Sequence, residues 1–173
     1  AHAAGWLWDI GLPTRRGIGC VYASAFMSDD EAEDVLARYC RRIASDLPSP
    51  RRLTFRSAYR TAPWTANCLA IGQSAGFMEP LESTSIHLIQ TGILRLIALF
   101  PGRGFNAADT DEYNRQTDFE YRDVRDFIIA HYKVTAREDT EFWRYLKHMP
   151  VPDSLTERLE LFRSSGRFFM HAK

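Results

Sequence analysis

The amino-acid sequence predicts an α+β fold class, in which a small mixed or antiparallel β region is followed by a mainly helical half. Three observations predict it. Two apolar segments flank a turn near residue 15, a short apolar run ends in small residues at 72–76, and apolar residues recur at helical spacing from residue 86. We expect a β-rich segment with one helix over residues 1–81 and a helical segment over residues 82–173, forming one compact piece.

The elements of the first half follow from local patterns. Apolar stretches at 6–12 and 18–24 lie on either side of Pro13-Thr14-Arg15-Arg16-Gly17, which predicts a hairpin. Ser28 and Glu31 have the spacing of a capping box, so a helix is expected from Asp29 to about Asp46, where Leu47-Pro48 ends it. Residues 53–61 and 66–71 are predicted strands, and within the second of these the run 68–71 is predicted to be buried.

The second half shows helical periodicity almost throughout. A helix opened by Glu82-Ser83-Thr84 and ended by Pro101-Gly102 is expected to pack its apolar face in the core. That face comprises Ile86, Ile89, Ile93, Leu96, Ile97 and Phe100. A long helix over about 110–131 is expected to place one stripe inward, consisting of Tyr113, Thr117, Tyr121, Val124, Ile128 and His131. Shorter helices are expected over 140–148 and 154–162, the latter with a second capping box at Ser154 and Glu157.

Composition excludes several classes of protein. The 22 basic and 22 acidic residues give a net charge of 22 − 22 = 0, so a nucleic-acid partner is not expected. Cys20, Cys40 and Cys68 form no pair set, which favours reduced thiols in a cytoplasmic protein. The apolar run 88–100 is too short for a membrane span and carries Gln90 and Arg95. The histidines have no metal-ligand spacing, so no metal is predicted.

The most informative stretch is 67–86, where an apolar run, a string of small residues and a helix start follow one another. Small residues let the backbone approach a flat ligand closely. A helix start offers free N–H groups and a positive dipole end to an anion. On residue type alone, Glu82 could equally be an N-terminal charge, and Ser83 or Thr84 an ordinary cap.

Three motifs in one order carry a family resemblance. They are Gly5-Trp6-Leu7-Trp8-Asp9-Ile10, the stretch 67–86, and a third segment with Arg125-Asp126-Phe127, His131-Tyr132 and residues 137–143. Together they resemble the signatures of flavin-dependent halogenases of the tryptophan halogenase family, whose fold is a larger FAD-dependent monooxygenase-like one. The double-tryptophan motif distinguishes these halogenases from related flavin hydroxylases.

The resemblance implies a role for each site residue. It places Glu82 as the catalytic group that orients the aromatic substrate or removes its ring proton. The backbone N–H groups of Thr84 and Ser85 would bind the halide. The flavin would contact Gly72, Ser74, Ala75, Gly76, Pro80 and Leu81, the substrate Tyr132, Glu138, Phe142 and Trp143, and the tunnel would be lined by Trp6 and Trp8. The alternatives are two core aromatics for the tryptophans and a helix–turn–helix packing joint for 131–143.

The activity that the resemblance implies needs FAD as FADH2, oxygen, and chloride or bromide. It halogenates an electron-rich aromatic, tryptophan or another indole, in the cytoplasm, with reduced flavin from a separate reductase; a homodimer is left open. The family's Gly-rich phosphate loop and its lysine are absent from this sequence, so we expect a fragment of a longer enzyme that is inactive alone. A flavin-dependent aromatic hydroxylase and a non-catalytic interaction domain are the alternatives.

Overall fold

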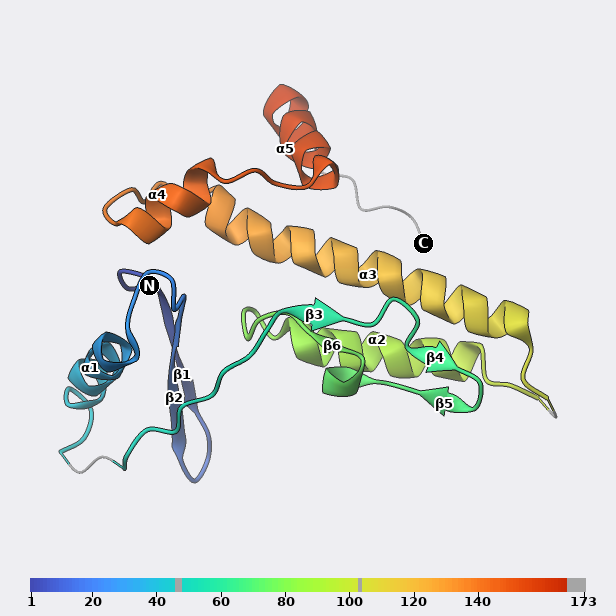
Figure 1. Ribbon diagram of the computed structural model, residues 1–173, viewed down its shortest axis with the longest axis horizontal. Helices are drawn as coiled ribbons and strands as arrows, with labels where there is room; N and C mark the ends of the chain where they lie inside the picture. Colours follow the sequence, from blue (N-terminus) through green and yellow to red (C-terminus); the bar gives the residue numbers. More distant parts are fainter. Residues whose placement is uncertain (46–47, 103, 168–173) are drawn as a thin grey trace. The chain divides into compact units, whose positions relative to one another are not determined.

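The computed structural model describes residues 1–45, 48–102 and 104–167. Its helices are joined to short antiparallel strand pairs, which confirms the predicted α+β class. The elements in chain order are β1 (Gly5–Gly11), β2 (Arg16–Tyr22), α1 (Asp29–Cys40), β3 (Ala58–Tyr59), β4 (Trp64–Thr65), β5 (Cys68–Leu69), the 3₁₀ turn η1 (Gly72–Ser74), β6 (Gly76–Phe77), α2 (Thr84–Ala98), α3 (Ala107–Lys133), α4 (Glu141–His148) and α5 (Asp153–Ser165) (Figure 1).

The chain divides into two compact units. The first comprises Ala1–Leu53 with His131–Pro150, and the second comprises Thr54–Ala130 with Val151–Lys173. Each unit therefore combines segments from both sides of residue 82. The division at residue 82 that the sequence patterns suggest stays a prediction.

The hairpin at the start of the first unit forms as predicted. β1 and β2 pair antiparallel, with Gly5 opposite Tyr22 at one end and Gly11 opposite Arg16 at the other. Near the turn, the Arg16 guanidinium donates two hydrogen bonds to the Asp9 carboxylate, at 2.6 and 2.7 Å. The Tyr39 hydroxyl of α1 donates a third, at 2.6 Å. These bonds hold the pKa of Asp9 below its usual value, and those from Arg16 have the larger effect.

Helix α1 begins where its capping box predicts but ends early. The Glu31 N–H donates to the Ser28 hydroxyl, and the Glu31 carboxylate accepts from the Ser28 N–H, so both bonds of the box form. The helix ends at Cys40 and is followed by a turn in which residues 41–45 are exposed. Packing sustains most protein helices, and this segment has no buried face. The predicted end at Asp46 and Leu47 lies outside the described residues.

Two predicted strands, 53–61 and 66–71, are longer than the strands that form, and the predicted burial of the run 68–71 is wrong. Of residues 53–61 only Ala58–Tyr59 pairs, with β6, while Leu53 is 70% exposed. Of residues 66–71 only Cys68–Leu69 pairs, with β4. The run 68–71 is not a buried strand, because its one neighbour is the two-residue strand β4 and Cys68 is exposed.

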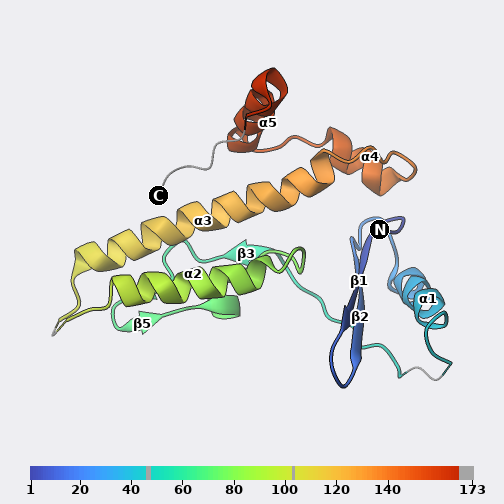
Figure 2. The ribbon, with the colours of Figure 1, turned by 180° about the vertical axis from the view of Figure 1, so that it is seen from behind.

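Helices α2 and α3 lie side by side in the second unit (Figures 1 and 2). The predicted inward stripe of α3 is confirmed except at His131, which is exposed. For α2 the predicted face is wrong. Its buried residues are Thr84, Leu88, Gly92 and Arg95, whereas Ile86, Ile89, Ile93, Ile97 and Phe100 are 37–70% exposed.

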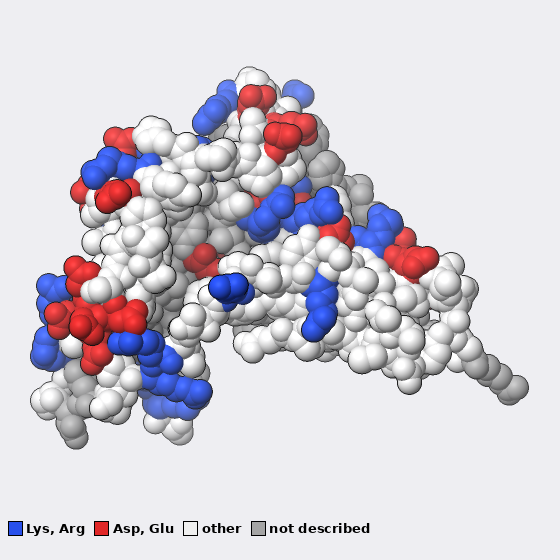
Figure 3. Space-filling view, viewed as in Figure 1, with Lys and Arg blue, Asp and Glu red and all other residues white. Residues whose placement is uncertain are grey.

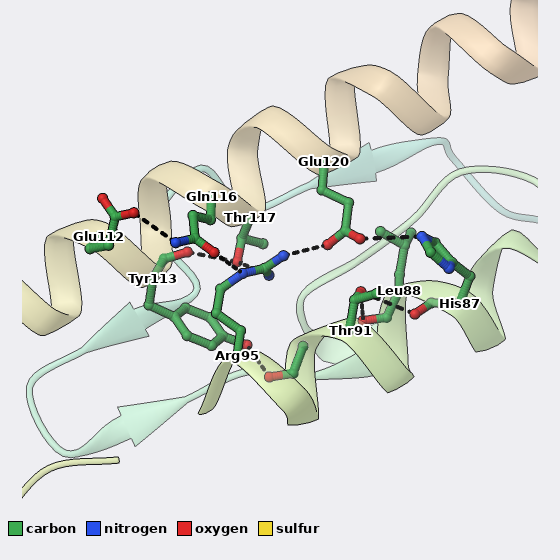
Figure 4. Close-up of polar contacts among 10 residues, drawn as sticks. His87, Leu88, Thr91, Arg95, Glu112, Tyr113, Gln116, Thr117 and Glu120 are labelled. Carbon is green, nitrogen blue, oxygen red and sulfur yellow. Dashed lines mark hydrogen bonds and ion pairs between the residues drawn. The ribbon is translucent and has the colours of Figure 1, made fainter. Parts of the chain in front are cut away.

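The reason for the inversion is a buried polar contact between the two helices (Figure 4). Arg95 is buried, and its Nη2 donates to Glu120 Oε2 of α3 at 2.7 Å, while Nη1 donates to Thr117 Oγ1 at 2.8 Å. Its guanidinium also lies over the Tyr113 ring, 5.4 Å from the centroid. The Tyr113 hydroxyl donates to the Gly92 carbonyl at 3.1 Å. These partners satisfy a charged residue that the sequence pattern would place outside.

Helix α5 attaches to α3 through another buried carboxylate. Asp126 is 2% exposed and accepts from the Arg125 guanidinium and from the Ser154 hydroxyl. Because its hydroxyl is used in this way, Ser154 does not cap α5, and the predicted capping box with Glu157 is absent. The helix instead begins after Pro152.

The described surface carries both signs of charge. On the face drawn in Figure 3, basic and acidic side chains lie close together, with a large acidic group over the first turn of α1, where Asp29, Asp30 and Glu31 follow the cap. In the part of the chain that the structure describes, no helix combines the length and the apolar character needed to cross a membrane.

Replacing Glu120 by Gln should destabilise the second unit by about 3–5 kcal/mol, because Arg95 would stay buried without its counter-charge. The double variant Arg95→Met, Glu120→Leu should recover most of that loss, since it removes both charges together. Urea unfolding followed by circular dichroism measures both.

The matched control is Asp111→Asn on the same helix, which removes an exposed carboxylate outside the Arg95–Glu120 contacts and should change the urea midpoint little. Equal midpoints for Glu120→Gln and this control would show that the buried pair is not a principal contact between α2 and α3.

Candidate functional site

The small residues at 72–76 form a tight turn with its own hydrogen bonds. Gly72 has φ +68°, a conformation that glycine adopts without strain. The Ala75 N–H donates to the Gly72 carbonyl at 2.9 Å, and the Ser74 hydroxyl donates to the Ile71 carbonyl at 2.8 Å. Arg60, which precedes the turn in sequence, stabilises it, because its Nε donates to the Ser74 carbonyl at 2.9 Å. The predicted turn is therefore present and rigidly supported.

Gly76 is glycine for a packing reason within the chain. An added Cβ would lie 2.5 Å from Tyr59 Cβ and 2.9 Å from Tyr121 Cε1. The Tyr59 and Tyr121 rings stack, with centroids 4.8 Å apart, and the Tyr59 hydroxyl donates to Asp118 at 2.8 Å. Burial is the main reason that the pKa values of both tyrosines are raised. In this segment Ala75 is also buried, whereas Gln73, Ser74 and Pro80 are exposed and accessible to a ligand.

The chain entering α2 adopts an unusual backbone conformation. Glu82 and Ser83 both have positive φ, 53° and 57°, although neither is glycine. Such residues cost of order 1–3 kcal/mol each and are concentrated at functional sites. Glu82 therefore does not lie in the first helical turn, as the sequence suggests, but precedes the helix, with an exposed side chain. Ser83 is the N-cap, without a capping bond from its side chain.

The two predicted halide donors differ in availability. The Thr84 N–H donates to the Leu81 carbonyl at 3.3 Å, and the buried Thr84 hydroxyl donates to the same oxygen at 3.2 Å. Within the described residues the Ser85 N–H has no hydrogen-bond partner, as is usual for the second residue of a helix. Ser85 lies within the helix and is not among the positive-φ residues, so a serine is tolerated there. The strained residues are Glu82 and Ser83, directly before the helix.

The predicted substrate segment lies in the first unit, where Phe142 and Trp143 are buried in its hydrophobic core. Their neighbours there include Ala4, Met27 and Ala32. The Trp143 indole N–H donates to the His2 carbonyl at 2.8 Å, and the Arg137 guanidinium lies over the Trp143 ring at 4.6 Å. Phe142 and Trp143 therefore contribute to the packing of the first unit. A substrate-binding role for these two rings stays a prediction.

Tyr132 and Trp6 are joined directly. The Trp6 indole N–H donates to the Tyr132 hydroxyl at 3.0 Å, and the Tyr132 ring packs near Phe142 and Trp143. The structure therefore brings one predicted tunnel residue into contact with one predicted substrate residue. The other tunnel residue, Trp8, lies over β2, where an added Cβ at Gly19 would be 2.2 Å from its ring.

Glu138 is exposed and paired with basic side chains of α4. Its Oε1 lies 2.5 Å from Lys147 Nζ and 3.7 Å from His148 Nε2. The bond from Lys147 holds the pKa of Glu138 below its usual value, so the carboxylate is charged at neutral pH. Both of these contacts are made by Oε1, and a carboxylate accepts from several donors, so Lys147 does not prevent Glu138 from receiving the ammonium end of a ligand.

The polar residues that connect α2 with α3 were not identified from the sequence. His87, Arg95 and Glu120 form a connected set between α2 and α3 (Figure 4). One signal could have found them: Arg95 shares its helical stripe with Leu88 and Gly92, and Glu120 shares one with Thr117. In the portion of the chain with described placement, no group of three or more His, Cys, Asp or Glu residues could hold a metal ion.

Comparison with known proteins gives consistent matches. A sequence profile described as tryptophan halogenase matches residues 1–173. The 7-chloro-L-tryptophan 6-halogenase KtzR of Kutzneria sp. (strain 744) is 38% identical over 164 residues, which are 95% of this chain and 32% of that protein.

Solved structures agree. BrvH, a flavin-dependent halogenase from Brevundimonas sp. BAL3, superposes with a TM-score of 0.93 at 49% identity, over 99% of this chain and 34% of its own. Xcc4156, a flavin-dependent halogenase from Xanthomonas campestris, gives 0.92 at 46% identity, over 100% and 34%. The chain thus spans about a third of the length of the relatives it matches.

Gly76→Ala should lower the free energy of unfolding by about 1–3 kcal/mol, because the added methyl group collides with the Tyr59 backbone and the Tyr121 ring. Gly104→Ala is the control, since nothing lies within 4 Å of an added Cβ there. Thermal or urea unfolding of the two variants makes the comparison. Equal stability of the two would show that the Tyr59–Tyr121 stack can move aside without loss.

Proposed function

The chain belongs to the tryptophan halogenase family, and from this we propose that it is the part of a flavin-dependent halogenase that carries the halide turn and the substrate segment. The proposed reaction uses FADH2, oxygen, and chloride or bromide to halogenate an electron-rich aromatic, tryptophan or another indole. A separate reductase would supply reduced flavin, in the cytoplasm. The relatives named above are tryptophan or flavin-dependent halogenases, which supports this over a hydroxylase.

One observation carries the proposal. A left-handed turn of two non-glycine residues, Glu82 and Ser83, places an exposed carboxylate directly before a helix whose Ser85 N–H has no partner among the described residues. An N–H that can bind an anion and a carboxylate that can take a ring proton are two of the groups that halogenation of an aromatic ring would use. Ordinary capping explains neither the positive φ of Glu82 nor the absence of a capping bond from Ser83.

The flavin contacts that this chain can supply fit one side of a flat ring. Gly72 has a conformation in which a Cβ would be strained, and Ser74 and Pro80 are exposed. These small residues, with Leu81, would hold the ring, whereas Ala75 and Gly76 act by shaping the turn. When bound, reduced flavin with oxygen supplies the oxidising power that turns halide into an electrophile. The residues of this chain would position the flavin, the halide and the aromatic substrate.

The chain's own groups have separate tasks in the proposed reaction. The Ser85 N–H would hold the halide at the start of α2, aided by the positive end of the helix dipole. The Glu82 carboxylate would face the aromatic ring and remove its proton after the halogen has added. Trp6 and Tyr132, joined at 3.0 Å, would fix one side of the substrate path. Also in the first unit, Glu138, Phe142 and Trp143 are the proposed substrate contacts and Trp8 is the second proposed tunnel residue.

Glu82→Gln keeps the shape of the side chain and removes its charge. If Glu82 takes the ring proton, turnover should fall about 10²–10⁴-fold. The assay needs a polypeptide of the length of the relatives that contains this chain. Halogenated product is measured beside hypohalous acid, which a small scavenger traps. Loss of product with the oxidant still formed is expected, and normal product yield would reduce Glu82 to a charge at a helix end.

The halide donor can be tested at Ser85. Ser85→Pro removes the N–H, which makes no bond to the described residues, so the bromide concentration for half-maximal rate should rise roughly ten- to hundredfold. Ser85→Ala keeps the N–H and should behave like the parent protein. Circular dichroism of both variants checks that α2 still forms. An unchanged bromide requirement in a folded Ser85→Pro variant would place the halide elsewhere.

A further inference from the structure

The left-handed turn before α2 needs support from the rest of the structure. Strained backbone persists only where surrounding contacts fix it. Near the turn these contacts are local: the Ser83 carbonyl accepts from the N–H groups of Ile86 and His87, at 3.0 and 3.3 Å, and Thr84 bonds to Leu81. All of them lie within residues 81–87. They would move together with the turn, so they cannot fix it relative to the remainder of the unit.

One side chain of the same helical turn reaches a different element. His87 Nε2 lies 3.2 Å from Glu120 Oε1 of α3 (Figure 4). The His87 side chain is 57% exposed, whereas Glu120 is 7% exposed. The other oxygen of that carboxylate, Oε2, accepts from Arg95 Nη2 at 2.7 Å. A single buried carboxylate therefore joins α3 to two points on α2, one in its first turn and one two turns further along.

Glu120 is well suited to act as a fixed anchor. Its backbone lies in the middle of the long helix α3, and its partner Arg95 is held further by Thr117 at 2.8 Å and Gln116 at 3.1 Å. An anchor held at this many points does not follow the motion of a flexible partner. His87 is then the movable end of the connection, and the backbone N–H of His87 itself bonds to Ser83.

We propose that His87, held by the buried Arg95–Glu120 pair, is a positioning residue that fixes the left-handed turn Glu82–Ser83 at the start of α2. A role of His87 in halide and substrate chemistry rests on the function proposed above. The effect of His87 on the Glu82–Ser83 turn is independent of that function. His87 touches neither reactant in this scheme and acts through the backbone of the turn.

The test on the chain itself is amide hydrogen exchange. His87→Ala should speed exchange in the first turn, residues 84–88, by about two- to fivefold, the factor expected for losing the close contact between a partly exposed His87 Nε2 and Glu120 Oε1. Residues 92–98, beyond the anchor, should exchange as before. His87→Gln retains an N–H donor for Glu120 and should restore most of the protection. Gln90→Ala, on the exposed side of α2, is the matched control.

A second variant tests the strain directly. Ser83→Gly makes the left-handed conformation intrinsically favourable, so in the His87→Ala background it should return slow exchange to the first turn. Unchanged exchange in His87→Ala would overturn the proposal. So would faster exchange spread evenly over α2 and α3, because that pattern indicates general loss of stability instead of release of one turn.

The link to function is measured separately, in a polypeptide of the length of the relatives. There His87→Ala should raise the half-saturating bromide concentration several-fold and change the rate at saturating bromide less, with His87→Gln close to the parent. If first-turn exchange responds and the bromide requirement does not, the positioning role of His87 stands and the halide site at Ser85 falls. The two proposals can therefore fail independently.

Discussion

The second unit depends on one buried ion pair, Arg95 with Glu120. A charged pair can remain in an apolar interface only if hydrogen bonds satisfy its remaining groups. Here Thr117 and Gln116 accept hydrogen bonds from Arg95, and the Tyr113 ring lies against its guanidinium. The pair sets the rotation of α2 about its axis and hence which face meets α3. It also determines where the first turn of α2 lies, and with it the strained residues that precede the helix.

The first unit uses a different solution, in which backbone carbonyls of the N-terminal segment receive side-chain donors from far along the chain. His2 and Ala3 accept from Trp143, Arg137 and Thr140. These bonds span more than 130 positions of sequence. The N-terminal segment and the predicted substrate segment thereby pack in one core, and a change in Phe142 or Trp143 would alter the stability of the first unit.

Local features could be predicted from the sequence, and features that depend on a partner could not. The β1–β2 hairpin, the Ser28 capping box and the inward stripe of α3 are set by neighbours a few residues away. The isoleucine stripe of α2 shows that periodicity identifies an apolar face without saying what covers it. The second capping box failed because Asp126, distant in sequence, takes the Ser154 hydroxyl. The site motifs identified the turn, but nothing local predicts positive φ at Glu82, a residue type that rarely adopts it.

The Trp8 ring over Gly17 and Gly19 has a consequence for how the hairpin avoids mispairing. In the observed register Trp8 lies opposite Gly19, where no side chain competes for the space. A slip of one residue would place the indole opposite Ile18 or Cys20 and turn the side chains of the shifted strand to the wrong face. The Trp8 ring occupies the space that side chains at positions 17 and 19 would otherwise fill, so this packing favours the observed register. Backbone hydrogen bonds alone are compatible with several registers, and the packing of Trp8 on the two glycines favours one of them.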